Sequence, residues 1–135
     1  MQTINELGTY TFQALLENSI KRFGERPALS FVSGAPISYN EANKQIEQLQ
    51  QVLYRLGINH GDKVAIYSHS VPHWGIAYFA IVTMGAIAVP LLPDFTDKEV
   101  KSCLEHSETT MIIASEKLMS RIPETVSVLI DMLNC

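Results

Sequence analysis

Short apolar runs alternate with helical patterns in the second half of this 135-residue chain, and that alternation limits the possible folds most strongly. Residues 64–66, within a strand expected at 63–68, are continuously apolar, as in strands that are covered on both faces. Further strands are predicted at 87–91, 110–114 and 127–131. Strands and helices that alternate at this spacing predict an α/β fold with a mostly parallel sheet, helices on both faces and right-handed crossovers.

Three helices are expected between and after these strands. Residues 74–84 are apolar nearly all round, so we expect a deeply buried helix there, with Ser70 as its N-cap. Thr96 and Glu99 have the spacing of a capping box, which predicts the start of the next helix. A short helix should follow at 115–121. The inner face of the middle helix is expected to consist of Val100, Cys103 and Leu104.

The first third of the chain predicts a helix and a hairpin. Apolar residues recur at helical spacing in residues 11–23, and Gly24 is expected to end that helix in a left-handed conformation. Two short strands at 28–32 and 37–39, separated by a turn, predict an N-terminal β-hairpin.

A longer amphipathic helix should follow the hairpin. Asn40 is its expected N-cap, and Gly57 its expected stop. One stripe of this helix carries the apolar residues Ala42, Ile46, Leu49, Leu53 and Leu56. We therefore expect that stripe to pack against the rest of the fold.

The composition is that of one packed α/β domain over residues 1–135. Hydrophobic residues make up 47% of the chain and charged residues 18%, which excludes wholesale disorder. The net charge is −4 and there is no basic run, so nucleic acid is not an expected partner. The two cysteines, Cys103 and Cys135, are far apart, which fits a reducing cytosol, and residues 1–10 have no secretory signal pattern. We expect a cytoplasmic protein.

One segment has the length of a membrane span. Residues 71–92 contain no Asp, Glu, Lys or Arg. Gly85 and Pro90 interrupt the segment, however, and its β-branched residues cluster late. A buried helix followed by a buried strand explains the pattern better, so we expect no transmembrane segment.

Known phosphate-binding loops and nucleophile motifs are missing. Neither G-x-G-x-x-G nor G-x-x-x-x-G-K-[ST] occurs, and no G-x-S-x-G elbow surrounds Ser68 or Ser70. His69 and His73 have a spacing that zinc can use, but no third ligand follows, so two ordinary polar residues are the preferred interpretation. We predict no catalytic residue and no metal site in this chain.

Three other sets of residues each allow a functional and a structural interpretation. Cys103 lies on an inner helix stripe, where a small buried hydrophobe is favoured over a nucleophile. Tyr78 and Phe79 are expected in the core, with an acyl tunnel as the alternative. Lys117 and Arg121 are four residues apart after a strand end, where anion contacts are the alternative to a solvated helix face.

The order and spacing of several short segments resemble the N-terminal region of adenylate-forming enzymes, which include acyl-CoA synthetases, luciferases and adenylation domains. The resemblance extends from Phe12 to Arg121. The one mild departure is Ser70, where the family usually has a capping Asn. The matching segments are 37–39 (Ile-Ser-Tyr), 56–58 (Leu-Gly-Ile), 61–66 (Gly-Asp-Lys-Val-Ala-Ile), 72–74 (Pro-His-Trp), 85–91 (Gly-Ala-Ile-Ala-Val-Pro-Leu) and the helix–strand unit of 99–115.

This resemblance implies a parent enzyme that activates a carboxylic acid with ATP and Mg²⁺ and then transfers the acyl group to CoA. The N-terminal segment is most similar to that of bacterial long-chain fatty acid–CoA ligases. The family's phosphate loop, ribose-binding aspartate and catalytic lysine would all lie beyond Cys135, so we expect this chain alone to be inactive and to bind no cofactor. In some relatives, basic residues near the positions of Lys117 and Arg121 approach the CoA phosphates.

Two rival functions remain open on the sequence. An excised subdomain would expose apolar surface, so a stand-alone interaction module that self-associates is one alternative. A small nucleotide-binding protein is the other, although it lacks a phosphate loop. The sequence leaves open the identity of the acid, the acyl acceptor, the oligomeric state and whether the protein naturally ends at Cys135.

Overall fold

The computed structural model describes residues 8–130, and side chains within residues 8–127. Asp131, the expected end of the last strand, and Cys135 lie outside the described residues. The helices and strands, in chain order, are α1 (Phe12–Phe23), β1 (Pro27–Leu29), β2 (Ile37–Ser38), α2 (Tyr39–Arg55), β3 (Lys63–Tyr67), α3 (Pro72–Thr83), β4 (Ile87–Leu91), α4 (Asp97–Ser107), β5 (Met111–Ala114), the 3₁₀ helix η2 (Glu116–Arg121) and β6 (Ser127–Ile130).

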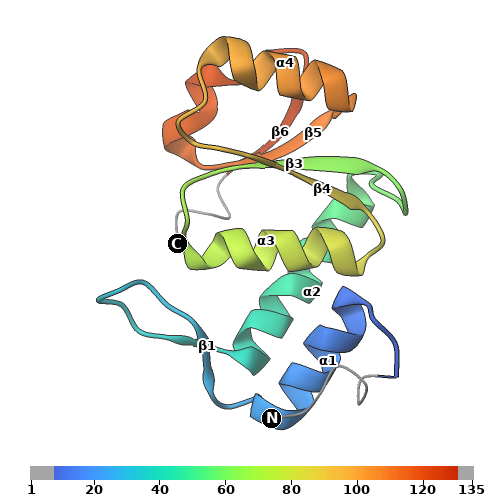
Figure 1. Cartoon of the computed structure of the whole chain (residues 1–135), viewed down its shortest axis with the longest axis vertical. Coiled ribbons are helices and arrows are strands. Elements are labelled where there is room, and N and C mark those ends of the chain that lie inside the picture. The colour runs from blue at the N-terminus through green and yellow to red at the C-terminus, as the bar shows by residue number, and fades with distance from the viewer. Residues whose placement is uncertain (1–7, 131–135) are drawn as a thin grey trace.

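The second half of the chain forms a four-stranded sheet in the order β4-β3-β5-β6 (Figure 1). Every neighbouring pair in this sheet is parallel, and Val64 of β3 is paired with Ala88 of β4 on one side and Met111 of β5 on the other. β1 and β2 form a separate antiparallel pair. The predicted parallel α/β sheet and the predicted N-terminal hairpin are therefore both confirmed.

Successive residues of the central strand β3 enter two different cores. Val64 and Ile66 pack with α2 and α3 on one face of the sheet. Ala65 and Tyr67 pack with α4 and η2 on the other face. Figure 1 shows α3 and α2 below the sheet and α4 above it. All four of these β3 residues are fully buried, as the continuous apolar run predicts for a strand between two helical layers.

Two helix starts differ from the prediction. α2 begins two residues earlier than expected, because Ser38 accepts a hydrogen bond from the amide of Glu41 and the Glu41 carboxylate accepts one from the amide of Ser38. This capping box replaces the predicted cap at Asn40. α3 has Val71 as its N-cap residue, without a side-chain cap, so the predicted role of Ser70 is wrong; Pro72 at the first helical position supplies a fixed backbone angle instead.

The end of α1 also corrects the prediction. Gly24 has right-handed backbone angles, φ −39° and ψ −48°, rather than left-handed ones. Its lack of a side chain matters for another reason, because a Cβ atom there would lie 2.7 Å from the side-chain oxygen of Asn40. Gly57, at φ +88°, does end α2 as predicted.

The predicted first strand of the hairpin is too long by three residues. The amide of Gly34 donates to the carbonyl oxygen of Phe31 at 3.2 Å, so Phe31 and Val32 belong to the turn instead. The predicted apolar stripe of α2 is also too long, since its first four members are buried but Leu56 is 48% exposed.

α3 is buried on one side and half-buried on the other. Ile76, Ala77, Ala80 and Ile81 lie in the core, as predicted. Trp74 and Tyr78 stack at 5.4 Å between ring centroids on the half-buried side, where Phe12 of α1 meets Tyr78 edge-on. Within residues 8–130, no helix combines the length and apolarity needed to cross a bilayer.

Candidate functional site

The loops that leave β4 and β5 lie side by side at the carboxyl edge of the sheet. Strands of a parallel sheet end at the same edge, and ligands of such folds commonly bind in crevices there. A shallow hollow of about 670 Å³ opens between the loop before α4 and the end of η2. It is lined by Asp94, Phe95, Thr96, Asp97, Lys98, Ser120 and Arg121.

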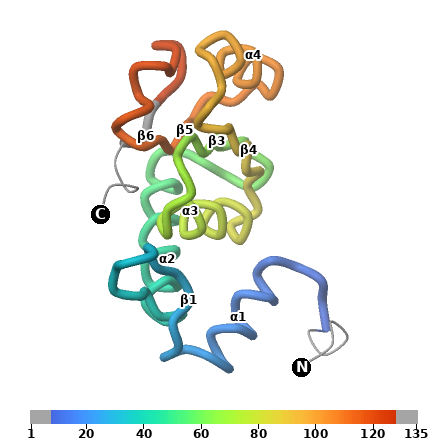
Figure 2. The backbone as a smooth tube through the Cα atoms, turned by 60° about the vertical axis from the view of Figure 1, so that its left-hand side comes forward, coloured from blue at the N-terminus to red at the C-terminus, as the bar shows by residue number. Residues whose placement is uncertain are grey.

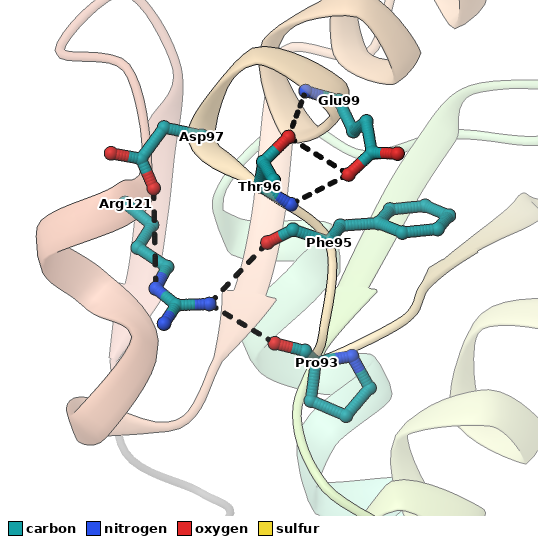
Figure 3. Close-up of polar contacts among 6 residues, drawn as sticks. All are labelled: Pro93, Phe95, Thr96, Asp97, Glu99 and Arg121. Carbon is teal, nitrogen blue, oxygen red and sulfur yellow. Dashed lines mark hydrogen bonds and ion pairs between the residues drawn. The ribbon is translucent and has the colours of Figure 1, made fainter.

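The α4 side of this hollow is held by the predicted capping box, which is confirmed. The amide of Glu99 donates to Thr96 Oγ1 at 3.3 Å, and the amide of Thr96 donates to Glu99 Oε2 at 2.7 Å (Figure 3). These bonds from the backbone and the hydroxyl of Thr96 lower the pKa of the Glu99 carboxyl below its ordinary value. The start of α4 is therefore fixed while Glu99 is ionised.

Arg121 links the two sides of the hollow. Its Nη1 donates to the carbonyl oxygens of Pro93 at 3.2 Å and Phe95 at 3.3 Å, and its Nε lies 4.0 Å from Asp97 (Figure 3). The ion pair with Asp97 is exposed and contributes little by itself. The two carbonyl bonds determine where the guanidinium lies.

Lys117 does not share the hollow with Arg121. The segment that carries both residues is a 3₁₀ helix, in which residues three apart lie on one face and residues four apart do not. Lys117 is exposed, and the second cation at the hollow is Lys98, in the first turn of α4. Sequence reasoning missed Lys98 because only the fold places α4 next to η2.

The hollow presents polar and charged groups but no activated nucleophile. In the part of the chain that the structure describes, Nη2 of Arg121 meets no acceptor and remains available to an oxyanion. Asp94 and Asp97 offset the two cations, so the local charge is balanced. No histidine or cysteine lines the hollow that could activate Thr96 or Ser120 as a nucleophile.

The remaining candidate residues lie apart from this hollow. His69 is exposed, whereas His73 is buried, with an Nδ1 that meets no hydrogen-bond partner; burial lowers the pKa of His73. Cys103 is half-buried and packs against the core between α4 and the sheet, as expected for a residue on the inner face of that helix. Among residues 8–130, no three potential metal ligands gather in one place.

A model of the AMP-binding enzyme family matches residues 16–134, which covers the hollow, the sheet and all helices but the start of α1. The chain belongs to this family. Its members are adenylate-forming ligases, and the matched part is their N-terminal region. The family resemblance stated from the sequence is therefore confirmed.

Two curated relatives show what fraction of a full-length family member this chain covers. It is 31% identical over 97 residues to crotonobetaine/carnitine–CoA ligase of Escherichia fergusonii, covering 69% of this chain and 19% of that protein. It is 26% identical over 106 residues to surfactin synthase subunit 2 of Bacillus subtilis, covering 78% of this chain and 3% of that protein. The chain thus spans a fifth or less of the length of these relatives.

The solved structure shows the shared fold. The N-terminal subdomain of NpsA from Klebsiella oxytoca, in complex with 3-hydroxyanthranilyl-AMSN, superposes with a TM-score of 0.84 at 23% identity. The superposition covers 96% of this chain and 33% of that one. The predicted fold, the N-terminal subdomain of an adenylate-forming enzyme, is confirmed.

Proposed function

We propose that this chain is the N-terminal unit of an ATP-dependent acid–CoA ligase. The observation that carries the proposal is the family match over residues 16–134. In the first step the acid's carboxylate displaces pyrophosphate from ATP, with Mg²⁺ assisting, to give an acyl-adenylate. In the second step the thiol of CoA displaces AMP. The crotonobetaine/carnitine–CoA ligase among the relatives supports CoA as the acceptor.

A fatty acid is the proposed substrate, and the cytoplasm the proposed location. The similarity of the N-terminal segment to bacterial long-chain ligases supports the fatty acid. The relatives also include a protein named for a different acid, so the substrate needs its own test.

The CoA phosphates are the proposed ligand of the basic residues at the carboxyl edge. Arg121 supports this role through its available Nη2, and Lys117 through its exposed position on the same 3₁₀ helix. CoA titrated into the polypeptide that the complete gene encodes should bind more weakly after either substitution to alanine. If a residue contacts the 3′-phosphate, its substitution should weaken the binding of 3′-dephospho-CoA less than the binding of CoA.

The proposed ligase activity is tested by acid-dependent ATP–pyrophosphate exchange. The polypeptide encoded by the complete gene should catalyse exchange with long-chain fatty acids faster than with benzoate or short polar acids. The 135-residue chain alone should catalyse none, because it holds no phosphate loop or catalytic lysine. Exchange by the chain alone, or none by the complete polypeptide with any acid, would contradict the proposal.

Self-association of the isolated chain is the second proposal. Large apolar side chains are exposed over α1 and at the hairpin tip, which supports it: Tyr10 is 72% exposed, Phe12 46% and Val32 fully exposed. Light scattering over a hundredfold concentration range should show a mass that rises with concentration. A constant monomer mass would contradict this proposal.

A further inference from the structure

An apolar hollow lies between α1, the hairpin, α2 and α3, on the opposite side of α3 from the sheet. Figures 1 and 2 show α1 beneath α3 and beside α2. The hollow has a volume of about 280 Å³. Its main walls are Leu15 and Leu16 of α1, Leu29 of β1, Ile46 of α2 and Ile76 and Phe79 of α3.

The lining of this hollow contains no charged side chain. Its hydroxyl groups belong to Ser19 and Tyr39, and the Ser19 hydroxyl donates back to the carbonyl oxygen of Leu15 at 2.8 Å. A charged ligand group would lose its water here without gaining a partner, which is unfavourable. The lining therefore selects for an uncharged, apolar molecule.

A second hollow on the other side of α1 provides a contrast. Leu16 and Ile46 line both hollows and so form the wall between them. The second hollow, of about 370 Å³, is surrounded by charged and amide side chains, among them Glu17, Lys21 and Glu47. Of these two hollows, the one on the Leu29 side has the lining without charged side chains.

α1 is the wall that can give way to admit a ligand. None of its twelve residues is fully buried, although Leu16 packs against the core. Elements with few buried apolar contacts open more readily than the core of a protein. α1 can therefore be displaced more readily than α2 and α3, which are joined through Gln50, whose Nε2 donates to Thr83 Oγ1 at 2.8 Å.

We propose that this hollow binds one small, uncharged apolar molecule, with roughly the size of a six- to eight-carbon chain. An apolar cavity of about 150 Å³ in another protein holds benzene, and this hollow is nearly twice as large. One turn of a partner's helix, about 10 Å wide and about 5.4 Å long, would occupy more than the 280 Å³ of this hollow. The site is independent of the proposed ligase activity, and its test needs no ATP.

The probe for the test is 1-hexanol, titrated into the chain while amide chemical shifts are followed by NMR. We expect saturable shifts at Leu15, Leu29 and Phe79. Hexanoate, which differs in its charged carboxylate, should bind at least tenfold more weakly. No saturable binding of hexanol, or equal binding of hexanoate, would overturn the proposal.

Gly75 of α3 supplies the variant that blocks the hollow. A Cβ atom at this position would lie 3.6 Å from Leu29 Cδ1, an ordinary contact, so the methyl group of an alanine fits there and a longer side chain would extend toward Leu29 and the hollow. Gly75→Leu should weaken hexanol binding at least tenfold by filling the hollow, and it should not unfold the protein, because leucine favours a helix more than glycine does. Gly75→Ala shares the helix preference and should keep binding within about threefold of the parent chain. Undiminished binding in Gly75→Leu would overturn the proposal.

Discussion

Arg121 donates a hydrogen bond to the carbonyl oxygen of Phe95, which precedes it by 26 residues. Together with the bond to Pro93, this contact joins the end of η2 to the loop that enters α4. The loop is therefore held by a side chain from a different βα unit.

Removal of that side chain should loosen the loop. We expect Arg121→Ala to lower the free energy of unfolding by about 1 kcal/mol. A buried charge-assisted hydrogen bond would contribute more, but the Arg121 side chain is 42% exposed, so water weakens its bonds. Hydrogen exchange at residues 92–96 should quicken. Lys117→Ala, the matched control on η2, should change stability by less than about 0.5 kcal/mol and leave exchange unchanged. Equal effects of the two substitutions would show that the link does not hold the loop.

The hydroxyl groups of Ser38 and Thr96 should contribute more to the free energy of unfolding than that of Ser70, the N-cap predicted for α3. Ser38→Ala and Thr96→Ala each remove a side-chain cap, and each should cost about 1 kcal/mol in urea denaturation. Ser70→Ala should cost less than about 0.5 kcal/mol, because α3 has no side-chain cap. A cost at Ser70 as large as that at Ser38 would mean that α3 is capped in solution.

Both capping boxes should weaken in acid. The pKa values of Glu41 and Glu99 are lowered by bonds from Ser38 and Thr96, so each carboxylate contributes stability that is complete above the unfolded value of 4.5. That contribution is lost as pH falls through the lower folded pKa. Below pH 4.5, the free energy of unfolding of Glu99→Gln should fall less steeply with decreasing pH than that of the parent chain. An unchanged acid slope would contradict the assignment.

Buried His73 should add a separate pH dependence. Burial lowers its pKa from 6.5, so the unfolded chain takes up a proton more readily than the folded one. Its contribution to stability is therefore complete above pH 6.5 and declines as the pH falls below that value. His73→Leu should flatten the stability profile just below pH 6.5. A profile unaltered by His73→Leu would exclude this residue as the cause.

Sequence patterns predicted the elements better than the details of their ends. The apolar run of β3 and the Thr96–Glu99 spacing depend on local rules, and both predictions are confirmed. The sequence from Ser38 to Glu41 satisfies the same spacing rule, but Asn40 is a second residue of N-cap type two positions later, so the local pattern offers two possible starts for α2.

Other features depend on contacts that no local pattern contains. The space beside Gly24 is taken by the side chain of Asn40, sixteen residues away, whereas its own backbone angles are ordinary right-handed ones. The spacing of Lys117 and Arg121 suggested a shared face only because an α-helix was assumed where a 3₁₀ helix forms. The partners of Arg121 come from the β4–α4 loop, so only the folded chain brings this site together.

The measurement that tests the central claim most directly is thioester formation by the polypeptide that the complete gene encodes. ATP, Mg²⁺, CoA and a long-chain fatty acid should together give acyl-CoA, AMP and pyrophosphate in equal amounts, as detected by mass spectrometry. If no carboxylic acid yields AMP or a CoA thioester, the chain is not the N-terminal unit of an acid–CoA ligase.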